Sequence, residues 1–261
     1  MKYLKLRRVS AKIDRTSSRQ FRAWHRRLGL VSCLFIFLLS VTGVLINHAH
    51  HMGLDKRGVK IDWLLDFYGI SLPSKINHFT HLPSPLVGID NQLWLEDRLI
   101  LESSLPVLWA LWYQKQIIAI DARQLYIFDH LGQLLETQGS SSGLTPPLSN
   151  LSISIDNRVL LHTKEGPLRS DQQLLDWQST DETAPDNPSR YVSIAHALDI
   201  NPKLLTLSRS EHLSWERVIL DMHSGRLFGA WAIWLWDLFA LALMLLTLSG
   251  IWMWQNKKFR R

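Results

Sequence analysis

The feature that most constrains this chain is a pair of long apolar segments, one near each end. Residues 28–47 form twenty consecutive residues without a charge, and residues 227–254 contain a single charged residue, Asp237. An α-helix rises ~1.5 Å per residue, so the first segment reaches ~30 Å, the thickness of the hydrocarbon layer of a bilayer. The sequence therefore predicts two transmembrane helices and makes the lipid bilayer the first expected partner.

Charge is distributed unevenly around these two segments. Residues 1–27 carry ten Lys or Arg against one acid, residues 48–226 carry fifteen against twenty-one, and residues 255–261 carry four Lys or Arg. Basic residues close to membrane segments stay on the cytoplasmic side. We expect both termini in the cytoplasm of a bacterium, the helices in the inner membrane, and residues 48–226 as a periplasmic domain. The pI near 9.5 then reflects topology, and nucleic acid is not an expected partner.

The ends of the apolar segments fit a membrane anchor better than a cleaved leader. The first apolar stretch is longer than that of a signal peptide, and no small-x-small cleavage site follows it. Tryptophans gather at both ends of the second segment, as they do at membrane–water interfaces. The only cysteine, Cys33, lies in the first segment, so no disulfide is expected in the exported domain.

Between the helices the pattern predicts a mainly antiparallel β domain, arranged as a meander or a sandwich, so the fold class is membrane α+β. One short helix is expected at residues 59–70, capped by Asp62, with Trp63, Leu64 and Phe67 as apolar contacts. Short runs of β-favouring residues broken by turn residues predict strands. These runs are residues 85–90, 92–96, 98–103, 116–121, 124–129, 158–163 and 203–208.

A weak internal repeat runs through this β-rich region. Its three copies each begin with Ile-Asp and cover residues 89–95, 120–127 and 155–161, at spacings of 31 and 35 residues. Such spacings are close to those of propeller blades. A closed propeller needs at least four blades, so three copies favour the meander or sandwich.

The central region shows no catalytic machinery. Residues 139–143, GSSSG, match a nucleophile-elbow pattern, but two prolines follow and no helix is expected there. Residues 140–150 and 179–189 are predicted to be surface loops. The chain has no phosphate-binding loop, paired-cysteine motif or H-E-x-x-H motif, so the sequence favours a role other than enzyme.

The candidate chemistry lies where the apolar segments meet water. His48 follows the first segment and His223 precedes the second, so both are expected at the outer face; His25 is expected at the inner face. Neutral imidazole binds transition metals and haem iron. His48 and His223 could hold one haem b, or His48 with His50 or His51 could hold a divalent metal. Alternatively, these histidines only cap helices and contact lipid headgroups.

Polar residues inside the membrane segments indicate a further contact. Asp237 is costly in lipid, so it should face a helix partner, water or a ligand. Thr42-Gly43 and Ser249-Gly250 are small polar pairs that allow close helix approach. Since the two helices run in opposite directions, we expect these pairs near opposite membrane faces, where they suggest another membrane protein or a homodimer.

Several motifs together resemble the PepSY-associated transmembrane family of bacterial inner-membrane proteins. They cover both ends of the chain and little of its centre. The motifs are WHRRLGL at residues 24–30, SVTG at 40–43, LLDFYGI at 64–70, LDMHSGRLFG at 220–229, WDL at 236–238 and LSGIWMW at 248–254.

This resemblance implies a role in iron uptake, envelope redox chemistry or regulation of envelope proteins. Larger relatives with four helices include haem-containing siderophore reductases, and His25 and His223 match the family's histidine positions. Two hypotheses result: an accessory or regulatory protein that docks on a membrane complex, or a haem b electron carrier.

Overall fold

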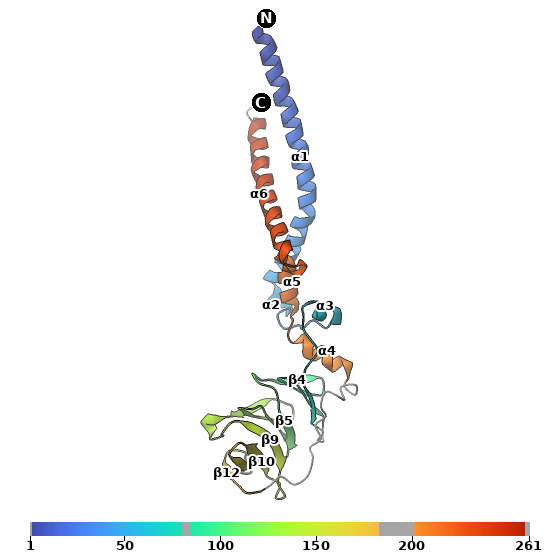
Figure 1. Ribbon diagram of the computed structural model, residues 1–261. Coiled ribbons are helices and arrows are strands. Elements are labelled where there is room, and N and C mark those ends of the chain that lie inside the picture. The colour runs from blue at the N-terminus through green and yellow to red at the C-terminus, as the bar shows by residue number, and fades with distance from the viewer. Residues whose placement is uncertain (1, 80–83, 183–200, 259–261) are drawn as a thin grey trace. The chain divides into compact units, whose positions relative to one another are not determined.

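The computed structural model describes residues 2–79, 84–182 and 201–258 and separates the chain into two compact units. The helix unit combines Met1–Val59 with Leu213–Arg261, and the β unit is Lys60–His212 (Figure 1).

Two long helices dominate the helix unit. Helix α1 spans Lys2–Asn47 and α6 spans Ala230–Lys258, and within them Arg22–Asn47 and Ala230–Gln255 are long and apolar enough to cross a membrane. Only 17% and 6% of the most apolar windows of these segments are buried, whereas the core helix of a soluble protein would be covered. The two predicted spans are therefore confirmed, although the first helix begins well before residue 28. Shorter elements are α2 (Ala49–Met52), α5 (Trp215–His223) and η3 (Arg226–Phe228).

Aromatic side chains fix one end of the contact between α1 and α6. The Phe35 ring is buried, stacks on Phe239 at a centroid distance of 4.3 Å and meets Trp236 edge-on at 5.0 Å. Gly225 adopts a left-handed φ of +79°, and a Cβ there would lie 2.7 Å from Trp236 Cδ2. Glycine is therefore required where Trp236 packs over the turn after α5.

The chain leaves the helix unit and returns to it at neighbouring points. Gly58 and Ser214 form an antiparallel bridge, Val59 N donates to Leu213 O at 2.8 Å, and Trp215 N donates to Arg57 O at 3.0 Å. We call this pairing of residues 57–59 with 213–215 the clasp.

The described residues of the β unit form three four-stranded antiparallel sheets, and in each the strands pair in the order of the chain. The first sheet consists of β1 (Ile76–Phe79), β2 (Leu86–Ile89), β3 (Gln92–Leu95) and β4 (Arg98–Glu102). The second consists of β5 (Trp109–Tyr113), β6 (Gln116–Ile120), β7 (Leu125–Phe128) and β8 (Leu134–Gln138). The third consists of β9 (Leu148–Ile153), β10 (Val159–Thr163), β11 (Gly166–Ser170) and β12 (Trp177–Ser179).

The predicted fold class is confirmed, with meanders as the β architecture. Six of the seven predicted strand segments contain a strand, and the three Ile-Asp copies lie at the turns β2–β3, β6–β7 and β9–β10. Asp121 shows why the acid recurs: its Oδ1 accepts from the backbone N–H groups of Arg123 and Gln124, and its Oδ2 accepts from Ser103 Oγ. The side chain thereby accepts hydrogen bonds from turn N–H groups that have no partner in a neighbouring strand.

The prediction of a strand at residues 203–208 was wrong, because this segment belongs to helix α4 (Pro202–Ser210). The Asn201 side chain caps the helix by accepting from Lys203 N, and proline at the first helical position has the φ that a helix needs. Leu204, Leu205 and Leu207 then pack against one face of the first sheet. The rest of the sheets surround the main core, which includes Leu93, Ile118, Phe128 and Leu161.

The short helix predicted at residues 59–70 exists as α3 (Asp62–Phe67), but two details were wrong. Ile61 occupies the cap position and Asp62 begins the helix, where its charge favours the helix dipole. The side chains that pack inside are Leu64 and Leu65, while Trp63 and Phe67 are 69% and 62% exposed.

The two predicted loops have different outcomes. Residues 140–142 form a one-turn 3-10 helix, η1, after β8, but β9 already begins at Leu148, so the first predicted loop is too long. No α-helix follows GSSSG, so the nucleophile-elbow geometry is absent from this described segment. The second loop, residues 179–189, lies mostly outside the described residues.

A buried arginine joins α4 to α3. Arg209 is 4% exposed; its Nη2 donates to Ile70 O at 2.6 Å and to Asp66 Oδ1, and its Nη1 lies 3.5 Å from Asp62 Oδ1. Both carboxylates are mostly exposed, so the guanidinium is the desolvated partner and depends on these acceptors.

Replacing Arg209 with Met should lower the opening free energy of α3 by about 2 kcal/mol, because Ile70 O loses its charged donor. Hydrogen exchange followed by mass spectrometry would report faster exchange of the α3 amides. Lys203→Met is the matched control, since the Lys203–Asp97 pair is exposed and worth less than about 1 kcal/mol. Equal exchange in the two variants would contradict this account.

Candidate functional site

Each of two half-buried histidines in the helix unit bonds a hydroxyl of a different helix. His25 of α1 places Nδ1 2.7 Å from Ser249 Oγ of α6. His223, the last residue of α5, places Nδ1 2.8 Å from Thr42 Oγ1 of α1. We call these two contacts the inner and outer histidine–hydroxyl pairs, after the orientation that the basic termini predict.

The hydroxyl groups determine which ring nitrogen carries the proton. Thr42 Oγ1 donates to Leu38 O at 2.7 Å, and Ser249 Oγ donates to Leu246 O at 2.9 Å. A hydroxyl has one proton, so each oxygen is left to accept from the imidazole. We infer that each ring carries a proton on Nδ1, so that in the neutral imidazole the Nε2 lone pair is left for a ligand.

A glycine beside each hydroxyl residue lies against the imidazole. A Cβ at Gly43 would lie 3.6 Å from His223 Cε1, and one at Gly250 would lie 3.8 Å from His25 Cε1, both ordinary van der Waals distances. The backbone of His223 is also held, since Trp236 Nε1 donates to its carbonyl oxygen at 2.9 Å.

The two small polar pairs therefore meet histidines of the same chain. The expectation that they lie near opposite ends of the helix pair fits their bonds to His223 and His25. The expectation that they also contact another membrane protein or a second copy stays a prediction. His25 and Thr42 are both on α1, so the two histidine–hydroxyl pairs lie ~25 Å apart along this helix.

The other predicted ligands lie just after α1. His48 is exposed and its ring centroid is 6.5 Å from that of His51. His50 Nδ1 lies 3.0 Å from Asp55 Oδ2, and this hydrogen bond lowers the pKa of the Asp55 carboxyl. Within the described residues no group of three or more His, Cys, Asp or Glu side chains is placed to hold a metal ion. The pairing of His48 with His223, and the metal site at His48, His50 and His51, stay predictions.

Asp237 is exposed on the surface of α6, eight residues into the helix counted from Ala230. Its neighbours on that surface include Trp234 and Leu241, which are 77% and 49% exposed. A carboxylate at a depth of ~10 Å along a spanning helix is costly when it faces lipid. This surface is therefore suited to contact with another helix.

The histidine–hydroxyl pairs fit one axial ligand of a haem iron at each level. The fit rests on an oriented imidazole, a protonated Nδ1 with its own acceptor, and an Nε2 without a hydrogen bond among the described residues. One chain offers a single such imidazole per level, so a second axial ligand must come from elsewhere, such as His48 or a second chain.

The sequence singled out all four members of these pairs but did not predict that each histidine bonds a hydroxyl. It suggested His48 with His223 as one haem site, which stays a prediction, and found no histidine opposite His25. The usable signal was present: in antiparallel helices a histidine near the start of one helix lies opposite the end of the other, where the hydroxyl-glycine pair occurs.

Two spanning helices, a histidine bonded to a hydroxyl at each end of the pair, and a β unit between them define a class of membrane protein with an inserted domain. The chain belongs to the family described as the PepSY-associated TM region, whose model matches residues 3–257. A search among curated proteins finds no match.

Similarity to solved structures is partial. The chain is 13% identical to the WD40 β-propeller domain of Doa1 over 40% of this chain and 39% of that chain, with a TM-score of 0.31. It is 13% identical to the computationally designed Ika8 protein over 41% and 36%, with a TM-score of 0.33. It is 12% identical to the N-terminal domain of Nup159 over 42% of this chain and 30% of that chain, with a TM-score of 0.29. The chain therefore spans less than half of each of these structures.

The tautomers inferred above can be measured. In full-length protein with ¹⁵N-labelled histidine, His25 and His223 should show the Nδ1–H pattern by NMR. Thr42→Val should convert His223 to a mixture of tautomers, and Ser249→Ala should do the same for His25, because each ring loses its acceptor. Thr247→Val is the control, since Thr247 Oγ1 bonds Leu243 O of its own helix. An Nε2–H pattern in the unmodified protein would overturn the assignment.

Proposed function

We propose that this protein is an inner-membrane component of envelope redox chemistry or iron uptake that holds haem b through His25 and His223. Haem bound at the two levels would provide one-electron redox centres near both faces of the membrane. The observation that carries the proposal is the occurrence of the same arrangement twice: imidazole, hydroxyl acceptor and glycine.

The protein's own residues have defined tasks in this proposal. Thr42 and Ser249 orient the imidazoles and keep the proton on Nδ1, while Gly43 and Gly250 pack beside the rings. The ~25 Å between the pairs is most of the thickness of the hydrocarbon layer. An outer centre alone would not span this distance, whereas the inner pair supplies the second level.

A second histidine at the inner level would have to come from another helix pair, because His25 is the one histidine that a single chain places there among the described residues. The exposed Asp237 provides a polar contact for such an assembly. A second copy is the simplest source, since it brings another His25 and another His223. At the outer level His48 is the alternative ligand.

Orientation of the chain completes the proposal. The basic residues 1–27 and 255–261 favour a cytoplasmic location for both termini, and the β unit is then periplasmic. The inner histidine–hydroxyl pair faces the side where reduced cofactors are made, and the outer pair faces the compartment of the β unit.

Haem binding has a direct optical test. Protein purified in detergent from cells supplied with haem should show a Soret band, and His25→Ala or His223→Ala should each remove about half of it. His212→Ala is the control, because His212 is exposed at the end of the β unit and should leave the spectrum unchanged. A colourless purified protein, or a Soret band equal in all four proteins, would contradict haem binding at these histidines.

A second candidate function is that of an accessory or regulatory protein without haem. Its support is the exposed Asp237 surface, which suits docking on another membrane protein as well as on a second copy. In this case the histidine–hydroxyl pairs serve only to join α1 with α5 and α6.

Assembly through Asp237 can be tested apart from haem. Asp237→Leu should shift the protein to the monomer in native mass spectrometry from lipid nanodiscs, while Asp237→Asn, which keeps hydrogen-bonding atoms, should retain part of the assembly. Thr247→Leu is the control on the same helix. Retention of the full assembly in Asp237→Leu would exclude this contact. Co-purification of a different membrane protein that depends on Asp237 would favour the accessory role.

A further inference from the structure

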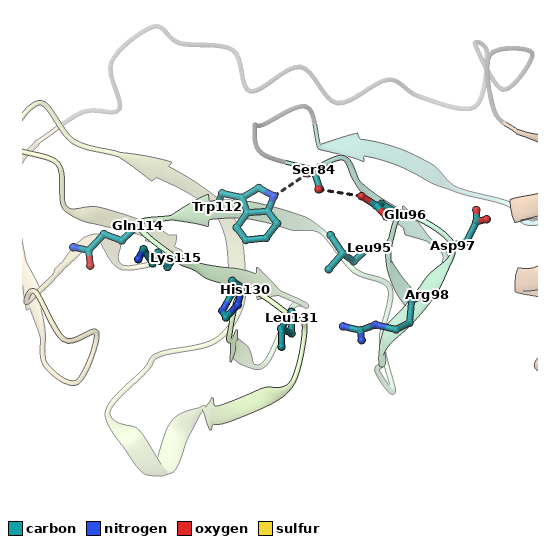
Figure 2. A pocket seen from close by; sticks show the side chains of 10 residues that line it. All are labelled: Ser84, Leu95, Glu96, Asp97, Arg98, Trp112, Gln114, Lys115, His130 and Leu131. Carbon is teal, nitrogen blue, oxygen red and sulfur yellow. Dashed lines mark hydrogen bonds between the residues drawn. The ribbon is translucent and has the colours of Figure 1, made fainter.

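A cavity of about 770 Å³ opens in the β unit between turns of the first and second sheets (Figure 2). Its lining comes from Ser84, from the β3–β4 and β5–β6 turns with the strand ends beside them, and from the β7–β8 connection. The lining residues are Ser84, Leu95, Glu96, Asp97, Arg98, Trp112, Gln114, Lys115, His130 and Leu131. A volume of this size accommodates a small organic molecule.

One wall of the cavity is apolar and rigid. Trp112 is 9% exposed, and its Nε1 donates to Ser84 O at 2.8 Å, so the polar edge of the indole is already bonded. Leu95 and Leu131 flank this ring in the cavity (Figure 2). A flat apolar body is the shape that this wall favours.

The cationic side chains of the cavity outnumber its uncompensated acids: Arg98 and Lys115 stand against Glu96, which keeps its negative charge beside Ser84. Asp97 Oδ2 is paired with Lys203 Nζ at 2.5 Å and points away from Trp112, and Glu96 Oε1 accepts from Ser84 Oγ at 3.1 Å (Figure 2). Arg98 and Lys115 form no ion pair among the described residues, and both are exposed. An anion in the cavity would therefore meet two cations whose charge is not already compensated.

The Arg98 guanidinium lies next to Gly132, close to the cavity. At φ +75° Gly132 occupies a turn conformation that favours glycine, and a Cβ there would lie 2.9 Å from Arg98 Nη2. The guanidinium thus lies against the β7–β8 connection beside Leu131, where its planar face and donors can meet a ligand. His130 adds a further polar group to the same connection.

We propose that this cavity binds a small aromatic anion, with its ring on Trp112 and its negative group between Arg98 and Lys115. The net charge of the domain around the cavity makes a preference for anions over cations a specific test of this site. Residues 48–226 carry six more acidic than basic residues, so the domain as a whole repels anions and only a local cationic site can retain one.

Two probes with one ring system and opposite charge test the proposal. Naphthalene-2-sulfonate and 2-naphthylmethylammonium would be titrated by equilibrium dialysis against full-length protein in zwitterionic nanodiscs, with empty nanodiscs subtracted. The sulfonate should bind one per chain, at least about tenfold tighter than the ammonium probe, and should weaken as salt is added.

Variants locate the site. R98Q/K115Q should weaken sulfonate binding by about tenfold, whereas the matched double variant R123Q/K164Q, which removes two exposed cations from other turns of the β unit, should change it by less than about twofold. D97N should tighten binding, because an acid is removed and Lys203 is released.

Three outcomes would overturn the proposal: no saturable sulfonate binding, equal binding of the two probes, or equal weakening in the two double variants. None of these depends on haem, so His25→Ala and His223→Ala protein should bind the sulfonate as the unmodified protein does. Failure of this site would leave the proposed function untouched, and the reverse also holds.

Discussion

A polar group inside a membrane must find a partner within the protein, because the hydrocarbon layer offers none. Two imidazoles of this chain meet that constraint by donating to hydroxyls that themselves donate to their own helix backbone. Each contact links elements that are far apart in the sequence, His25 to Ser249 and His223 to Thr42. The register of α1 against α5 and α6 follows from these two bonds and from the stacking of Phe35 on Phe239.

The spans and the sheet architecture could be predicted from local patterns. The length of the two segments with few or no charges predicted the helices, and the Ile-Asp repeats lie at three of the hairpin turns. Segment 203–208 shows where such reasoning fails: its alternating leucines suit a strand, but Asn201 and Pro202 begin a helix, and Gln92 then bonds both the hydroxyl and the carbonyl of Ser208 from the first sheet. Tertiary contact decided what the local pattern left open.

The residues of the candidate site could be picked out from the sequence, but which hydroxyl each histidine bonds could not. Residue type and position identified the histidines and the hydroxyl-glycine pairs, yet depth alone placed His48 beside His223. Which hydroxyl meets which imidazole depends on helix rotation and on where α5 ends. The cavity of the β unit gave no sequence signal, because Arg98, Lys115 and Trp112 come from separate turns and strands that only the stacking of two sheets brings together.

The clasp has a consequence for how such proteins can change. Because residues 57–59 and 213–215 pair with one another, everything between them begins and ends at almost one point. A segment anchored in this way can lengthen, shorten or be exchanged while the spacing of the spanning helices stays the same. The sequence of the membrane helices and that of the inserted unit can therefore change independently of one another.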